Sequence, residues 1–78
     1  MIFKQVDSSM IKSVAYDPSK QSLYVKFNSG RVYEYFSVPE RVYIDLLNAE
    51  SKGRFFRQEV QYVYDYVRRD DVTENGLN

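Results

Sequence analysis

The sequence predicts an α+β domain: a three-stranded antiparallel β-meander followed by two α-helices packed on one face. Two observations predict this order. Residues 10–36 hold three short runs in which apolar side chains alternate with polar ones, separated by turn-forming residues. Residues 37–69 instead repeat their apolar side chains every three to four positions, the period of an amphipathic helix. A chain of 78 residues is long enough for one hydrophobic core.

The strands are predicted at residues 10–16, 22–27 and 31–36. The first two are joined by Asp17-Pro18-Ser19-Lys20, a turn in which Asp can accept hydrogen bonds from its own backbone and Pro presets φ. The next two are joined by Asn28-Ser29-Gly30, which fits a three-residue hairpin loop with Gly30 in the left-handed position.

The length of this second loop decides the strand register. A three-residue loop places Val25 opposite Tyr33 and Leu23 opposite Tyr35, so both tyrosines share the face that the helices cover. A two-residue loop would shift the pairing by one and exchange the two faces of the strand. We favour the first register, in which Tyr33 and Tyr35 are a structural pair beneath the helices.

The helical half begins at Ser37-Val38-Pro39-Glu40, which matches a capping box with Pro39 in the first turn. Gly53 is predicted to end the first helix in a left-handed conformation. A second helix is expected over residues 54–69, with its last arginines at the negative end of the helix dipole. The domain is thus expected to span residues 8–69, and residues 70–78 to form a flexible acidic tail.

Composition excludes several classes of function. The chain has no Cys and no His, which argues against a structural zinc site, a catalytic triad or a Cys nucleophile. We expect no enzyme activity, no cofactor and no metal. The formal net charge is zero, so the chain lacks the strongly basic balance of a dedicated nucleic-acid binder. It shows neither a signal peptide nor an apolar run long enough to span a bilayer, which predicts a cytoplasmic protein without membrane contact.

The order of residues resembles the KTSC family, named for a module at the C-terminus of some lysyl-tRNA synthetases. The resemblance covers about residues 8–64 and rests on Ser8-Ser9, Ile11, Val14, Tyr16-Asp17, Leu23, Val25, Phe27, Gly30, Tyr33, Tyr35, Val38-Pro39, Tyr43, Leu46, Ala49, Ser51, Gly53, Phe56, Val60 and Tyr64. The chain departs from the family at Arg57, where we expect Asn. The resemblance implies a small domain that occurs alone or fused to the synthetase, with no established activity. RNA binding has been suggested for it largely from the fusion.

The second face of the predicted meander has no further element in the chain to cover it. It would present Tyr24, Lys26 and Phe36, with Arg31 near the hairpin tip. Aromatic and basic side chains combine in this way on sheets that bind single-stranded RNA. An isologous dimer could cover the same face instead.

A second candidate is the basic corner around Gly53, formed by Lys52, Arg54 and Arg57. Arginine and lysine side chains at such a corner can hold a phosphate or another anion.

These residues predict a non-enzymatic binding module for RNA or another anionic ligand. The expected ligand-binding residues are Tyr24, Lys26, Arg31, Phe36, Lys52, Arg54 and Arg57. The expected structural residues are Tyr33, Tyr35, Gly30, Pro39 and Gly53. The alternative is a module that binds another protein, or a second copy of itself, through the open sheet face.

Overall fold

The computed structural model describes residues 1–73 and 76–77. Its elements, in chain order, are β1 (Lys4–Gln5), β2 (Ile11–Asp17), β3 (Ser22–Phe27), β4 (Val32–Tyr35), α1 (Glu40–Asn48), α2 (Lys52–Glu59), β5 (Tyr66–Arg68), β6 (Val72–Thr73) and β7 (Gly76–Leu77). Strands β1 to β5 form one antiparallel sheet in that spatial order, while β6 and β7 pair separately. The α+β class is confirmed, but the main sheet has five strands rather than three.

The central meander has the predicted register. Val25 pairs with Tyr33 and Leu23 pairs with Tyr35. The Gly30 amide donates to the Phe27 carbonyl at 2.8 Å, and Gly30 has a φ of 97°. The left-handed glycine therefore closes a three-residue loop, as its sequence indicates.

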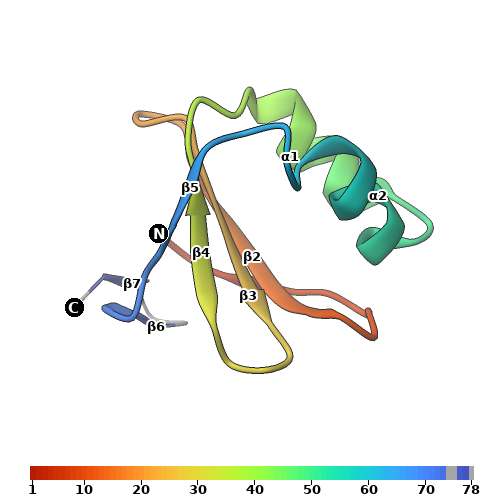
Figure 1. Ribbon diagram of the computed structural model, residues 1–78, viewed down its shortest axis with the longest axis horizontal. Coiled ribbons are helices and arrows are strands. Elements are labelled where there is room, and N and C mark those ends of the chain that lie inside the picture. The colour runs from red at the N-terminus through yellow and green to blue at the C-terminus, as the bar shows by residue number, and fades with distance from the viewer. Residues whose placement is uncertain (74–75, 78) are drawn as a thin grey trace.

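The main hydrophobic core lies between the sheet and the two helices. Both helices cover the same side of the sheet, and the β6–β7 hairpin lies on the opposite side (Figure 1). The strands contribute Val14, Leu23, Val25 and Tyr35 to this core, and all four are buried. The helical half contributes a second buried set: Val38, Tyr43, Leu46, Phe56 and Val60. Tyr33 and Tyr35 thus lie on the helix-covered face, as predicted.

The predicted second helix is wrong over most of its length. Helix α2 ends at Glu59, and residues 66–68 form strand β5, which pairs antiparallel with β4. Arg68 is therefore a strand residue and Arg69 directly follows the strand, so neither lies at the end of a helix.

Tyr62 marks where the helical path is broken. Its φ is 67°, a left-handed value that a right-handed helix cannot contain. The residues that follow, Val63-Tyr64-Asp65-Tyr66-Val67, are rich in β-branched and aromatic side chains, which favour strands. The same residues also fit a helical period, so the apolar spacing alone predicts the wrong element.

Both predicted helix boundaries need correction. Ser37 has a φ of 57° and α1 begins at Glu40 after the extended Pro39, without a side-chain cap. The cap of α2 is made instead by Ser51, whose hydroxyl accepts from the Arg54 amide at 3.3 Å. Gly53 lies in the first turn of α2 and does not end α1.

Replacing Gly53 and replacing Gly30 by alanine are expected to change the free energy of unfolding in opposite directions. A Cβ on Gly53 would lie 3.6 Å from Met10 Cε, which is ordinary contact, so Gly53→Ala should raise the free energy of unfolding by about 0.5–1 kcal/mol. Gly30→Ala should lower it by about 1–2 kcal/mol, because an L-residue is strained at that φ. Urea denaturation of the two variants measures both changes. Destabilisation by Gly53→Ala would contradict the helical placement of this glycine.

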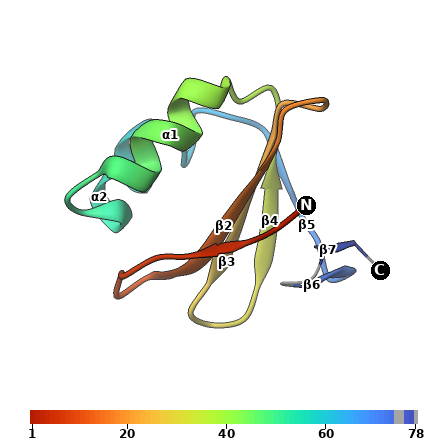
Figure 2. The ribbon, with the colours of Figure 1, turned by 180° about the vertical axis from the view of Figure 1, so that it is seen from behind.

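The second sheet face is covered, contrary to the expectation that it is open. Phe3 packs on it with Ala15, Tyr24 and Val32, and all four are buried. The rings of Phe3 and Tyr24 meet edge to face at 6.3 Å. Seen from behind, the N-terminus lies on the side of the sheet away from the helices (Figure 2). The residues that precede the predicted meander therefore provide part of its cover.

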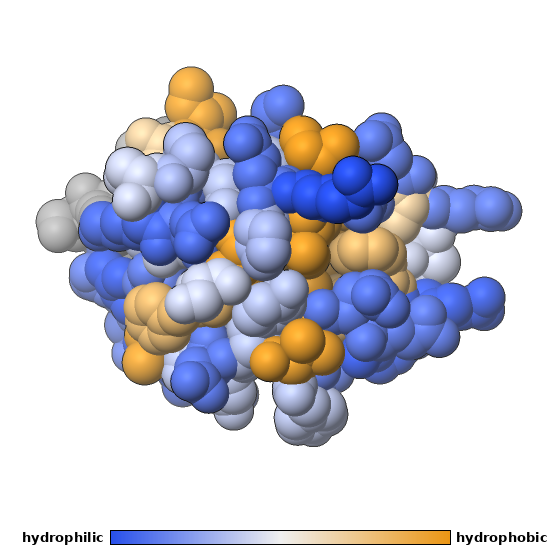
Figure 3. All heavy atoms as spheres, turned by 90° about the horizontal axis from the view of Figure 1, so that it is seen from above, coloured by the Kyte–Doolittle hydropathy of each residue, from blue (hydrophilic) through white to orange (hydrophobic). Residues whose placement is uncertain are grey.

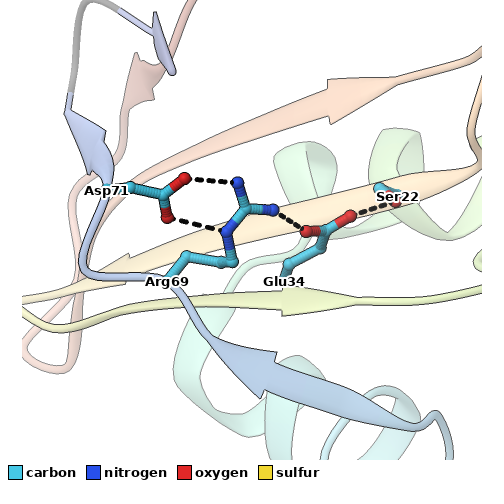
Figure 4. A network of polar contacts seen from close by, with 4 residues as sticks. All are labelled: Ser22, Glu34, Arg69 and Asp71. Atoms are coloured by element: carbon cyan, nitrogen blue, oxygen red, sulfur yellow. Dashed lines mark hydrogen bonds and ion pairs between the residues drawn. The ribbon is translucent and has the colours of Figure 1, made fainter. Parts of the chain in front are cut away.

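Arg69 provides the other part of this cover through a chain of polar contacts (Figure 4). Its guanidinium donates to Asp71 through two bonds of 2.8 Å and also pairs with Glu34. The buried Glu34 carboxylate in turn accepts from the Ser22 hydroxyl at 2.6 Å. Hydrogen bonding to Arg69 lowers the pKa of Asp71 to about 2. The chain after β5 is therefore tied to the middle of the sheet by charge.

The acidic tail is only partly described. Asp70 and Asp71 pair with Arg68 and Arg69. Glu74, Asn75 and Asn78 lie outside the described residues, so the flexibility expected of residues 70–78 stays a prediction. In the described part of the chain, neither helix has the length and apolar character needed to cross a membrane.

Candidate functional site: an aromatic groove beside a basic corner

An open groove of about 290 Å³ lies between the β3–β4 hairpin, β5 and the segment that follows α2. We call it the aromatic groove because six of its lining residues are aromatic: Phe27, Tyr33, Tyr35, Phe56, Tyr62 and Tyr66. Its remaining wall is made by Met10, Ser29, Arg31 and Gln61. Strand β5 is what creates the groove, because it places Tyr66 beside the tyrosines of β4.

The rings form a continuous stack across two strands. Tyr33 and Tyr66 are stacked with centroids 5.3 Å apart, and Tyr35 lies 5.6 Å from Tyr66. Phe27 and Phe56 support this stack from below through edge contacts of 5.7 Å to Tyr33 and 5.5 Å to Tyr35. Flat π surfaces held by such contacts are preorganised for stacking a further planar group.

Two of the rings are open to solvent. Tyr66 is 51% exposed and Tyr62 is 88% exposed. Tyr62 also has the left-handed backbone described above, which costs a residue with a Cβ about 1–2 kcal/mol. An exposed aromatic ring gains little from packing against its own chain. Strained residues of this kind concentrate at functional sites, so Tyr62 is the strongest single pointer to a ligand.

Besides its tyrosine hydroxyls, the groove is lined by three polar side chains, Ser29, Arg31 and Gln61. Arg31 is exposed and can pair with an anion, while Ser29 and Gln61 can donate and accept hydrogen bonds. Burial raises the pKa of Tyr35, and the neighbouring Tyr33 and Tyr66 raise it further. The Tyr35 hydroxyl is therefore protonated at neutral pH. This combination fits a planar ligand that also carries a negative charge.

A second, more polar hollow of about 290 Å³ adjoins the groove. It contains the predicted basic corner of Lys52, Arg54 and Arg57, together with the carboxylates of Asp7 and Glu50. Lys52 Nζ donates to the Ala49 carbonyl at 2.7 Å, so this lysine is engaged at the end of α1. The two arginines are exposed.

The structure separates the predicted ligand-binding residues into three places. Lys52, Arg54 and Arg57 are together at the basic corner, and Arg31 is at the groove. Tyr24 is fully buried on the second face, so its predicted place on an open surface is wrong. Lys26 lies in β3, the strand that also contains Tyr24, one position before its last residue Phe27.

Phe36 is 36% exposed just beyond β4, where its amide donates to the Asp65 carbonyl. The predicted surface of exposed aromatic residues around Phe36 does not form, because the second sheet face is covered.

Sequence reasoning missed the two exposed rings of the groove. The helix predicted over residues 54–69 contains Tyr62, Tyr66 and Gln61, and none of the three is among the predicted ligand-binding residues. A signal was present in the alternation of Tyr62, Tyr64 and Tyr66 with Val63, Asp65 and Val67, which is the period of a strand.

Viewed from above, the molecule shows apolar residues in separate spots among hydrophilic ones, rather than one continuous apolar surface (Figure 3).

The described residues contain no group of three or more acidic side chains placed to hold a metal ion. The groove and corner thus define a surface of aromatic, hydroxyl, amide and guanidinium groups.

The KTSC domain family matches residues 7–66, and the chain belongs to this family. A KTSC domain protein from Yersinia pestis has the same fold, with a TM-score of 0.84 and 34% identity over 86% of this chain and 94% of that one.

Relatives include both short proteins and a segment of a large enzyme. An uncharacterised protein of Stutzerimonas stutzeri is 47% identical over 53 residues, which cover 68% of this chain and 75% of that protein. A lysine–tRNA ligase of Nostoc sp. is 42% identical over 60 residues, which cover 77% of this chain. The match spans only 11% of the ligase's length.

Proposed function

We propose that this protein is a non-enzymatic RNA-binding module that stacks an unpaired base in the aromatic groove. The observation that carries the proposal is a pair of exposed rings in one groove: Tyr66, which belongs to the tyrosine stack, and Tyr62, which lines the same groove. Aromatic platforms are the usual device for binding unpaired bases, and each stacked base contributes about 1–3 kcal/mol. Arg31 at the groove rim supplies a positive charge for the backbone.

The relatives support this choice of ligand. A lysine–tRNA ligase, by its name, acts on an RNA, and it carries a segment similar to this chain. Presence in such a protein is an association and does not define the role of the segment. The groove adds a physical reason, since its ring faces and rim charge match a base and its phosphate.

The alternative function is a module that binds another protein, or a second copy of itself, through an open sheet face. In the structure that face is not open. Self-association was expected through an open sheet face, but Ala15, Tyr24 and Val32 are buried there within the same chain. The face is occupied by Phe3 and Arg69, so a second copy is not needed to cover it. The exposed rings of Tyr62 and Tyr66 lie at the groove on the other side of the sheet.

Replacing Tyr62 by glycine is expected to weaken RNA binding without weakening the fold. Glycine relieves the left-handed strain, so the free energy of unfolding should stay constant or rise by about 1 kcal/mol. Loss of the exposed ring should reduce affinity for a short single-stranded oligouridylate about 5- to 150-fold. Fluorescence anisotropy at low salt measures the affinity, and urea denaturation measures the stability.

The matched control is Tyr64→Phe, which keeps a ring in the same segment while Tyr64 is half-buried against the core. It should bind like the unchanged protein. Equal affinity of the Tyr62→Gly variant and the unchanged protein would contradict the groove as the binding site. Absence of binding by the unchanged protein at high micromolar concentration would refute the function itself.

A further inference from the structure

We infer that the aromatic groove and the basic corner form one continuous site for single-stranded RNA, with a base in the groove and a neighbouring backbone phosphate at the corner. This inference rests on the proposed function and specifies its ligand as a strand that continues past the stacked base. A free nucleoside or a free phosphate would occupy only half of the site.

Met10 joins the two halves. Its side chain lines the aromatic groove on one side and the polar hollow on the other, so the two hollows share a wall. Arg57 Nη1 lies 3.8 Å from Met10 Sδ, which places its guanidinium directly at that wall. A strand that leaves the groove across Met10 therefore meets Arg57 first.

The charge at the corner favours a phosphodiester over a free phosphate. Two arginines and one lysine face two carboxylates, Asp7 and Glu50, within the same hollow. The lysine is already engaged with a carbonyl group at the end of α1. The formal charges of these five side chains sum to +1, which matches the single negative charge of one backbone phosphate. A multiply charged free anion would be repelled more strongly by the two carboxylates.

The contact is made by arginine side chains rather than by helix amides. The Arg54 amide in the first turn of α2 already donates to the Ser51 hydroxyl. Arg54 and Arg57 are exposed, and a guanidinium can donate two parallel hydrogen bonds to a phosphate.

The test compares a groove variant and a corner variant on the same probe. The probe is an oligouridylate of about eight nucleotides, a length that one small single-strand-binding fold can cover. The corner variant combines Arg54→Gln and Arg57→Gln, and the groove variant is Tyr62→Gly. The control is Arg41→Gln, which removes an exposed charge of α1 that pairs only loosely with Asp45 at 3.9 Å. Affinity is measured over a series of salt concentrations.

The corner variant should bind about tenfold more weakly at low salt. Its dependence of log affinity on log salt should be shallower by about 0.7, as expected for the loss of one phosphate contact to a single strand. The groove variant should lose affinity with an unchanged salt dependence, because a ring carries no charge. The Arg41→Gln control should match the unchanged protein in both quantities.

Three results overturn the inference in different ways. If the groove variant binds weakly but the corner variant keeps full affinity and an unchanged salt dependence, the groove binds RNA without the corner, and only this inference fails. If inorganic phosphate displaces the probe from the unchanged protein at concentrations where added chloride of equal ionic strength does not, the corner is a site for a free anion. If neither variant loses affinity, both the continuous site and the proposed groove are wrong.

Discussion

Replacing Arg69 by methionine should lower the free energy of unfolding by about 3 kcal/mol, because it leaves a buried carboxylate without its cation. Glu34 is 4% exposed and lies in the middle of the sheet. Its partners are Arg69 and the Ser22 hydroxyl (Figure 4). Methionine keeps a long flexible side chain over the Tyr24 ring but removes the charge, so the loss reports the unpaired Glu34 rather than a cavity.

Urea denaturation measures the loss, and a second substitution assigns its cause. Adding Glu34→Gln to Arg69→Met removes the buried charge and should restore part of the lost stability. The control is Arg68→Met, since Arg68 precedes Arg69 in the chain and pairs with Asp70 through two exposed side chains. That change should stay within about 0.5 kcal/mol. Equal losses for Arg69→Met and Arg68→Met would contradict a structural role for the Glu34 pair.

Phe56→Ala should lower the free energy of unfolding by about 3–5 kcal/mol. Phe56 is 1% exposed and is the buried residue through which α2 contacts the sheet. Its ring meets Phe27 at 5.4 Å and Tyr35 at 5.5 Å, so its removal opens a cavity beneath the tyrosine stack. The walls of that cavity belong to three elements, β3, β4 and α2, which cannot close together without shifting the backbone.

The adjacent Phe55 provides the control, because it is only partly buried at the edge of the same core. Phe55→Ala removes the same atoms one position earlier and should cost clearly less. Chemical denaturation of the two variants compares the losses directly. A smaller loss for Phe56→Ala than for Phe55→Ala would mean that α2 presents a different face to the sheet.

The central meander could be predicted from sequence because its information is local. The loop Asn28-Ser29-Gly30 and the alternation of Leu23, Val25 and Phe27 fix its register within fifteen or so residues of chain. The flanking strands carry no comparable signal. Lys4 and Gln5 of β1 are polar and exposed, and β5 finds its partner in β4 only across the whole helical segment.

The candidate site was harder to predict because it depends on that distant pairing. Arg31 and the basic corner were identified from residue type, which the sequence shows directly. The aromatic groove exists only after β5 brings Tyr66 beside Tyr33, and the path of the chain there depends on a left-handed Tyr62. No pattern in the sequence favours that conformation for tyrosine. The covered second face was missed for the same reason, since Phe3 and Arg69 come from the two ends of the chain.

The position of β5 makes an edge strand of the sheet part of the groove. It is a strand of three residues at the end of the strand order, so its backbone bonds join it to one neighbour only. Amide groups in such a strand exchange with solvent through local opening more readily than those of a central strand. One wall of the groove is therefore an edge strand, which opens more readily than a central strand. A ligand bound against Tyr66 would hold that edge closed, and part of its binding energy would be used to keep the last strand of the main sheet in place.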